Sequence, residues 1–355
     1  MNLPLSITKN IHDWLFEVMP ASLAAVVEMI LIAVAFLGFF ALAGLLLVYM
    51  ERRIAAFFQL RLGPNRVGPQ GIFQTIADAL KLVSKELTVT DKADQFLYNL
   101  APYFVIVTSL MALSVLPFSQ EFHAFDINIG VFFLIAVSSV GVIGILLGGW
   151  SSNNKYALIG AMRSGLQTIS YELSVGLSIL TIVVLAGSLQ ISEIIAAQQK
   201  GGWFIIQGHI PAIIAFMIFM IAGTAETNRA PFDLIEAESE LGAGFHTEYS
   251  GMKFAYFFLA EFINMFIIAA IGAILFFGGW LSPFGITESI PLLGVFWFML
   301  KVLGLVFLMM WFRWTFPRLR VDQLLTLEWK YLLPINLFNI VLMAVVVLLG
   351  LTINF

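Results

Sequence analysis

Acidic side chains gather in one connecting segment, residues 224–250, of a chain in which only 11% of residues are charged. Carboxylates can take up and release protons, and on insertion scales each one near the centre of a bilayer costs about 2.5–3.5 kcal/mol. Since long apolar stretches flank this segment, it is either a solvated loop or part of a path for protons. Its acids are Glu226, Asp233, Glu236, Glu238, Glu240 and Glu248.

The order of residues within this segment predicts a short helix. Pro231 suits the first helical position, where its missing N–H costs nothing, and Gly242 suits the stop. Asp233 and Glu236 then lie near the positive end of the helix dipole. Spacings of three and four place Asp233, Glu236 and Glu240 on one acidic face, while Glu238 points elsewhere.

A second group of polar residues lies inside an apolar stretch, residues 157–186. Arg163, Gln167 and Tyr171 are spaced by four and share a helical face. Glu172 follows Arg163 by about 900° of helical rotation, which places it on the opposite face beside Thr168. This stretch is therefore predicted to be polar on two faces and packed inside the protein. Because intramembrane acids are usually functional, we expect Glu172 to relay protons or bind a ligand, the alternative being a structural hydrogen bond.

Two more charged residues fall within apolar stretches. Glu261 lies within FFLAEFINMF with Asn264 one turn further on, and the same two interpretations apply to it. Lys301 is either functional or structural. The structural interpretation is open because the long lysine side chain can extend its charged end to a polar boundary.

Composition predicts a polytopic, all-α membrane protein with one membrane domain over residues 1–355. Hydrophobic residues make up 60% of the chain and the mean hydropathy is +0.96. Apolar runs long enough to cross a bilayer recur along the length. The predicted spans lie near 23–49, 98–118, 130–150, 157–186, 209–224, 254–279, 294–312 and 332–352. Cysteine is absent and the four histidines lack metal-ligand spacing, so we expect no metal or Cys-ligated iron–sulfur cluster on this chain.

Positive charge gathers on one side of these spans, which fixes the predicted orientation. By the positive-inside rule this side faces the cytoplasm, so both termini are predicted on the outer, periplasmic side. The acidic loop 224–252 then faces the cytoplasm. The opposite side carries Lys9 and Lys200, and the cytoplasmic side carries Arg52, Arg53, Arg61, Arg66, Lys81, Lys85, Lys92, Lys155, Arg229, Lys253, Arg313, Arg318, Arg320 and Lys330.

The region 52–90 is too polar to cross the membrane. Residues 63–71, GPNRVGPQG, predict a turn-rich connector. Residues 72–87 predict an amphipathic helix lying at the cytoplasmic interface. Its apolar face would carry Phe73, Ile76, Leu80, Val83 and Leu87, and its polar face Gln74, Asp78, Lys81 and Lys85.

The first span ends in YMERR, residues 49–53. A basic anchor at the membrane surface is one interpretation. Glu51 beside Arg52 and Arg53 is unusual for a plain anchor, however. Together with Arg61 and the amphipathic helix, this cluster is the alternative candidate for a pocket that holds an amphiphile by its polar head.

Three long strings resemble the H subunit of the proton-translocating NADH–quinone oxidoreductases, which are also called respiratory complex I. The mitochondrial counterpart of this membrane subunit is subunit 1. They are LVYMERR with FQLRLGPNRVGPQG (47–71), SNNKYALIGAMRSGLQTISYE (152–172) and AETNRAPFDLIEAESELGAGFHTEY (225–249). The resemblance runs nearly end to end. It implies a position at the junction of the peripheral and membrane arms, where the chain forms much of the quinone chamber. FMN and the iron–sulfur clusters would then belong to partner subunits of the peripheral arm, and further membrane-arm subunits would lie alongside.

The resemblance also implies roles for individual residues. Glu51, Arg52, Arg61 and Asp78 match chamber or quinone-access residues, and Arg53 is grouped with them. A carboxylate path from quinone chemistry to proton pumping is implied for Glu172, Glu226, Arg229, Asp233, Glu236, Glu238, Glu240 and Glu261. To this path we add Tyr171 and Glu248, and Arg163 in a structural or coupling role.

Other functions remain open from the sequence. Membrane-bound hydrogenases use related subunits without quinone, although the ERR and RLGPN strings favour the quinone enzyme. A stand-alone proton-coupled transporter would show paired repeats, which this chain lacks. A passive scaffold for the peripheral arm is a third possibility. We expect a bacterial plasma membrane, with the mitochondrial inner membrane as the alternative, and the quinone is either ubiquinone or menaquinone.

Overall fold

The structure is a computed structural model that describes residues 6–120, 122–234, 242, 244–283 and 291–351. Over these residues the chain is helical with irregular connections, and eight of its helices are long and apolar enough to cross a membrane. The prediction of an all-α polytopic protein is therefore confirmed. The spanning helices are α2 (Ala21–Phe58), α4 (Gln95–Val115), α5 (Gly130–Ser151), α6 (Lys155–Ala186), α9 (His209–Glu226), α11 (Gly251–Phe277), α12 (Pro291–Thr315) and a final helix over Val321–Leu348.

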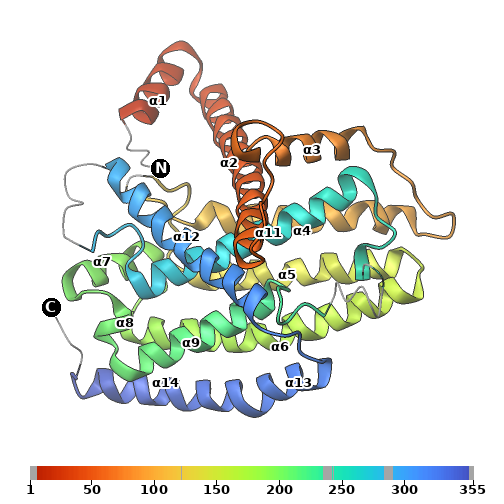
Figure 1. Ribbon diagram of the computed structural model, residues 1–355. Helices are drawn as coiled ribbons and strands as arrows, with labels where there is room; N and C mark the ends of the chain where they lie inside the picture. The colour runs from red at the N-terminus through yellow and green to blue at the C-terminus, as the bar shows by residue number, and fades with distance from the viewer. Residues whose placement is uncertain (1–5, 121, 235–241, 243, 284–290, 352–355) are drawn as a thin grey trace.

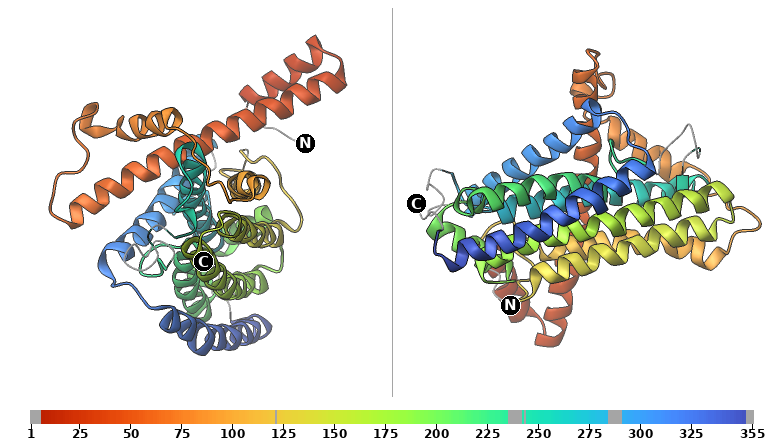
Figure 2. Two further views of the ribbon diagram at one scale, coloured as in Figure 1. Left: turned by 90° about the vertical axis from the view of Figure 1, so that its right-hand side faces the viewer. Right: turned by 90° about the horizontal axis from the view of Figure 1, so that it is seen from below.

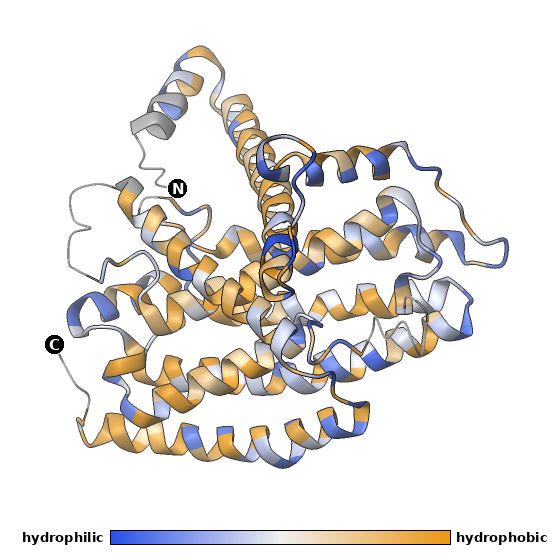
Figure 3. Cartoon of the chain, viewed as in Figure 1, coloured by the Kyte–Doolittle hydropathy of each residue, from blue (hydrophilic) through white to orange (hydrophobic). Residues whose placement is uncertain are grey.

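Helices α4, α5, α6, α9 and α14 (Leu333–Leu348) run roughly side by side, whereas α2 crosses the bundle steeply (Figure 1). The two further views show the same arrangement, with α2 lying over one side of the parallel helices (Figure 2). Hydrophobic residues dominate along the spans, and hydrophilic ones gather on α3 and at the turns (Figure 3). This pattern is expected of helices whose outer faces meet lipid.

Helix α11 lies at the centre of this assembly. It packs against α2, α4, α9 and α12, and its second half is almost continuously buried from Phe262 to Phe276. Glycine at its end allows the left-handed turn that stops it, because Gly278 has φ +73°. Since α11 carries Glu261, that carboxyl group is delivered to the middle of the helical packing.

Residues 52–58 continue α2 and are not part of the connector, which follows them and leads into α3. Gly71 has φ +75°, and a Cβ there would lie 2.2 Å from the carbonyl oxygen of Pro64, so only glycine closes this turn. Helix α3 (Gln74–Ser84) follows, somewhat shorter than the predicted 72–87. Its predicted apolar face is solvent-exposed at Phe73, Ile76, Leu80, Val83 and Leu87. A helix forms within the predicted range, and its amphipathic role at a membrane interface stays a prediction.

The last span begins earlier than predicted. Instead of starting near residue 332, it runs from α13 (Val321–Thr326) through a π-helical turn (Leu327–Leu332) into α14. Shorter helices complete the described chain. These are α1 (Ser6–Val18), α7 (Ile191–Gly201), α8 (Phe204–Gln207) and single 3-10 turns at Pro69–Gly71 (η1) and Gly244–His246 (η2).

Candidate functional site

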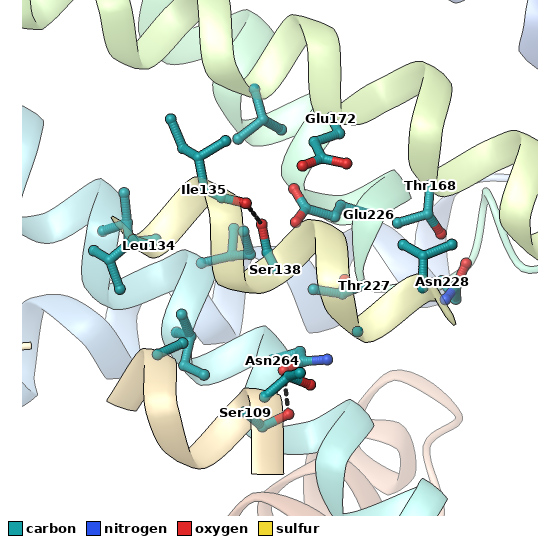
Figure 4. Close-up of a pocket in the computed structure, with 18 of the residues that line it drawn as sticks. Ser109, Leu134, Ile135, Ser138, Thr168, Glu172, Glu226, Thr227, Asn228 and Asn264 are labelled. Atoms are coloured by element: carbon teal, nitrogen blue, oxygen red, sulfur yellow. Dashed lines mark hydrogen bonds between the residues drawn. The ribbon is translucent and has the colours of Figure 1, made fainter. Parts of the chain in front are cut away.

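Two carboxyl groups from different helices face one internal cavity. Glu172 of α6 and Glu226, the last residue of α9, line a cavity of about 70 Å³ bounded by α4, α5, α6, α9 and α11. Their carboxyl groups point toward one another (Figure 4). One water needs roughly 10–15 Å³ of such volume, so the cavity has room for several.

The two acids differ in their hydrogen bonding. Ser139 of α5 donates a hydrogen bond to Glu172 Oε1. Thr168 lines the same cavity, as expected from its helical position beside Glu172. Glu226 Oε2 is buried and accepts no hydrogen bond from the part of the chain that the structure describes. A buried oxygen of this kind is costly unless water or a proton satisfies it.

A second, smaller cavity of about 40 Å³ adjoins the first. Glu226 lines both cavities, and the second is also lined by Glu261 and His246. Asn264 lines both as well, held by a 2.7 Å hydrogen bond from Ser109 Oγ to its Oδ1. Glu226 therefore shares one cavity with Glu172 and the other with Glu261, although the three residues lie far apart in the sequence.

Arg229 connects this space to the end of α2. Its Nε lies 3.1 Å from Glu261 Oε1 and its Nη1 lies 2.9 Å from Glu51 Oε2. Arg313 of α12 pairs with the other oxygen of Glu51. The Arg229 side chain is only 6% exposed, and its guanidinium also lies over the Phe262 ring. We call Glu51, Arg229, Glu261 and Arg313 the charge quartet. Two carboxylates and two guanidinium groups balance within it.

The described part of the acidic segment is not a solvated loop. Gln167 Nε2 donates to the carbonyl oxygens of Ala225 and Phe232, which holds the segment against α6. Asp233 is buried and its Oδ2 lies 3.1 Å from Arg318 Nη2. The predicted helix start at Pro231 is wrong, because residues 231–234 are irregular. These backbone groups bond to α6 and to Leu319 instead of forming a helical ladder. Glu236, Glu238 and Glu240 lie outside the described residues.

Glu248 has a different environment from the cavity acids. Its Oε1 accepts a 2.6 Å hydrogen bond from Asn154 Nδ2, and its backbone oxygen accepts one from Tyr98. Tyr98 and Tyr249 stack with ring centroids 4.1 Å apart. Burial raises the pKa of Tyr249, which keeps its hydroxyl neutral. Glu248 lines neither cavity, and its contacts anchor residues 244–250.

The other predicted residues of α6, Tyr171 and Arg163, belong by their spacing to the polar face opposite Glu172. Tyr171 is fully buried and donates to the carbonyl oxygen of Leu324 in α13, on the side away from the cavity. Arg163 is half-buried on α6. The two polar faces of α6 pack against neighbouring elements as predicted, but the helix is not wholly inside the protein, because Leu166, Ile169 and Leu173 form an exposed apolar face.

The predicted quinone residues lie around the end of α2 in a second cluster. Arg52 Nη1 lies 2.5 Å from Asp78 Oδ2, which joins α2 to α3. Arg53 Nη2 donates to Gln70 Oε1 at 3.0 Å and so holds the connector. Arg61 is exposed and donates to Gln59. Glu51 points the other way, into the charge quartet.

Lys301 caps a helix. Its Nζ donates to the carbonyl oxygens of Phe277, Gly279 and Leu281, at and just beyond the end of α11. The last carbonyls of a helix have no partner within the helix itself, and a cation there also complements the helix dipole. The structural interpretation of Lys301 is therefore the one that its contacts support.

The sequence did not single out Glu328, Arg313 or His246 as site residues. Glu328 is fully buried in the π-helical turn, where Ser174 Oγ donates to its Oε1 at 2.5 Å. π-Helical turns occur often at functional sites. Burial lowers the pKa of His246 to about 4, so its imidazole is neutral at neutral pH.

Fold and site together define a multi-pass helical membrane protein with ionisable groups buried between its spans. Comparison with known proteins identifies the family. Residues 27–344 match the family model described as NADH dehydrogenase. The chain therefore belongs to that family, and the resemblance noted from its motifs is confirmed.

The relatives are whole-length matches. The H subunit of the NADH-quinone oxidoreductase of Bacteroides fragilis is 56% identical over 353 residues, covering 97% of this chain and 98% of the relative. The same subunit of Geobacillus kaustophilus is 50% identical over 87% and 93% of the two chains. That of Carboxydothermus hydrogenoformans is 46% identical over 96% and 95%. The chain is thus a membrane subunit of a multi-subunit oxidoreductase.

Proposed function

We propose that this chain forms much of the quinone chamber of its complex and couples quinone reduction to proton movement through its buried carboxyl groups. Quinone, either ubiquinone or menaquinone, is the substrate at the chamber. Arg52, Arg53, Arg61 and Asp78 are assigned to quinone access, with Glu51 at the boundary between the chamber and the proton path. The peripheral-arm subunits complete the chamber, and adjacent membrane-arm subunits receive the coupled change.

The observation that carries this proposal is the position of Glu226 on both cavities. A proton held at Glu226 can exchange with Glu172 on one side and with Glu261 on the other through water in the cavities. In turn, Glu261 shares Arg229 with Glu51. A change of charge near the end of α2 therefore alters the electrostatic environment of Glu261, because few waters screen charges packed this closely.

Asp233 and the acids that follow it complete the proposed coupling segment. The charge of Asp233 is balanced by Arg318, and the backbone N–H of the neighbouring Leu319 donates to the carbonyl oxygen of Pro231. In the proposal this segment responds to quinone chemistry by changing protonation or shape. Orientation follows the positive-inside rule, with both termini on the periplasmic side of a bacterial plasma membrane.

The test is Glu172→Gln in the assembled complex, purified in mild detergent and reconstituted into liposomes. Glutamine keeps the acceptor for Ser139 but cannot take up a proton. NADH-driven proton uptake should fall by at least roughly tenfold, the loss expected when a proton-transfer group is removed. Glu193→Gln is the matched control, since Glu193 is exposed on α7. Normal pumping in Glu172→Gln at normal assembly would favour a passive scaffold.

A further inference from the structure

Among the described residues that line the two cavities, His246 is the titratable group that is not an acid. It lines the smaller cavity with Glu226 and Glu261, and its side chain is half-buried. His246 thus borders the internal space and keeps partial exposure at the surface of the bundle.

The position of the ring is set by close packing of its loop. A Cβ at Gly160 of α6 would lie 3.0 Å from Gly244 Cα and 3.0 Å from the Phe245 nitrogen, so glycine lets the loop approach α6. Phe245 and Phe254 hold the imidazole with ring centroids 5.0 and 5.2 Å away. The loop is therefore a fixed support for the ring.

The chemistry of the ring suits proton transfer without a change of net charge. A neutral imidazole has one N–H donor and one nitrogen acceptor, so it can accept a proton on one side and release one on the other. Among the described residues the ionisable groups that face it across the cavity are Glu226 and Glu261. Glu248, two residues on, is directed to Asn154. Burial holds the pKa of His246 near 4, which keeps the ring neutral.

We propose that His246 passes protons between the loop 244–250 and the cavity that holds Glu226 and Glu261. This inference rests on the proposed function and adds a point of proton exchange to it. A hydrated proton from the exposed side binds one ring nitrogen while the other nitrogen releases its proton to Glu226 or Glu261, so the imidazole ends neutral and one proton has moved from water to the carboxylate. In this role His246 is a relay that needs no positive charge of its own.

The experiment compares His246→Ala with His246→Phe in the reconstituted complex, measuring NADH-driven proton uptake. Both should pump at least roughly tenfold more slowly than the unmodified complex. Added imidazole should restore His246→Ala, which leaves space for it, but not His246→Phe, which fills the space and keeps the ring contacts. His123→Gln is the control, because His123 lines neither cavity.

Unchanged pumping in His246→Phe would overturn the relay. So would a slowed His246→Ala that imidazole does not restore, since that result means the histidine serves packing alone. Glu226→Gln distinguishes failure of the His246 relay from failure of the proposed function. If it loses pumping while His246→Phe keeps it, only the relay fails. If both keep it, the proposed function fails too.

Discussion

Arg229 Nη1 lies 2.9 Å from Glu51 Oε2, although the two residues are 178 positions apart in the chain. The same guanidinium lies 3.1 Å from Glu261 Oε1 through its Nε. One side chain thus ties the end of α2, near the proposed quinone chamber, to the middle of α11, beside the cavities. Any change of charge at Glu51 is felt at Glu261 through a single buried cation.

Replacing Arg229 tests how much the protein depends on the charge quartet. Arg229→Gln leaves two partly buried carboxylates facing one remaining arginine, and because Glu51 is 12% and Glu261 24% exposed the cost should stay below the about 3–5 kcal/mol of a fully buried pair. We expect a lower melting temperature of the purified complex and less assembled complex. The melting temperature of Arg229→Lys should lie between those of the unmodified complex and Arg229→Gln. A lysine ammonium keeps the charge but cannot reproduce the planar guanidinium group that pairs with two carboxylates. Arg66→Gln, on the exposed connector, is the control. A melting temperature of Arg229→Gln equal to that of the control would contradict the account.

Gly71 offers a test of the connector. A methyl group at this position meets the Pro64 carbonyl and also requires a left-handed backbone, so Gly71→Ala should distort the turn that positions α3. We expect weaker quinone reduction, seen as a raised KM for quinone, because Arg52 and Arg53 depend on this geometry. Gly304→Ala is the matched control, since a Cβ there meets nothing within 4 Å. An unchanged KM in Gly71→Ala would show that the connector does not shape the chamber.

Lys301 should matter for stability and not for pumping. Lys301→Met removes the donor for the carbonyls at the end of α11, and each buried acceptor left without a partner costs about 1–3 kcal/mol. The melting temperature should drop, while pumping per assembled complex stays unchanged. Lys200→Met, exposed in the last turn of α7, serves as the comparison. A fully stable Lys301→Met that fails to pump would reverse this assignment.

Glu328 and Ser174 should behave as a coupled pair between the π-helical turn and α6. Glu328→Gln keeps an acceptor for the Ser174 hydroxyl, so we expect near-normal stability. Glu328→Ala should be clearly destabilised. In a double-mutant cycle with Ser174→Ala the melting data should give a coupling of about 0.5–1.5 kcal/mol. Purely additive losses would mean that the 2.5 Å contact contributes nothing.

The features that could be predicted from the sequence are those that depend on local residue patterns. Apolar run length predicted the eight spans, and helical spacing predicted the two polar faces of α6, because both follow from regular geometry. Glu328 was missed because the last span was predicted to begin near residue 332, which left this acid outside the membrane. The π-helical continuation from α13 has no signal in hydropathy.

The charge quartet could not be predicted from spacing either. Glu51, Arg229 and Arg313 come from α2, the loop after α9, and α12, and only tertiary packing brings them together. Motif resemblance supplied Glu51, Arg229 and Glu261 as functional residues, but not their pairing. Pro231 is a case in which local pattern predicted a helix start that tertiary contacts prevent. A proline suits a helix start, yet the hydrogen bond from Leu319 to its carbonyl oxygen and the ion pair between buried Asp233 and exposed Arg318 hold an irregular segment.

The most direct test of the central claim is the rate of NADH-driven proton uptake by liposomes that carry the Glu226→Gln complex. Glu226 alone among the three cavity acids lines both described cavities, so its loss should interrupt exchange on both sides. The account predicts uptake at least roughly tenfold below that of the Glu193→Gln control at equal assembly. Uptake by Glu226→Gln equal to the control would contradict a proton path through these cavities.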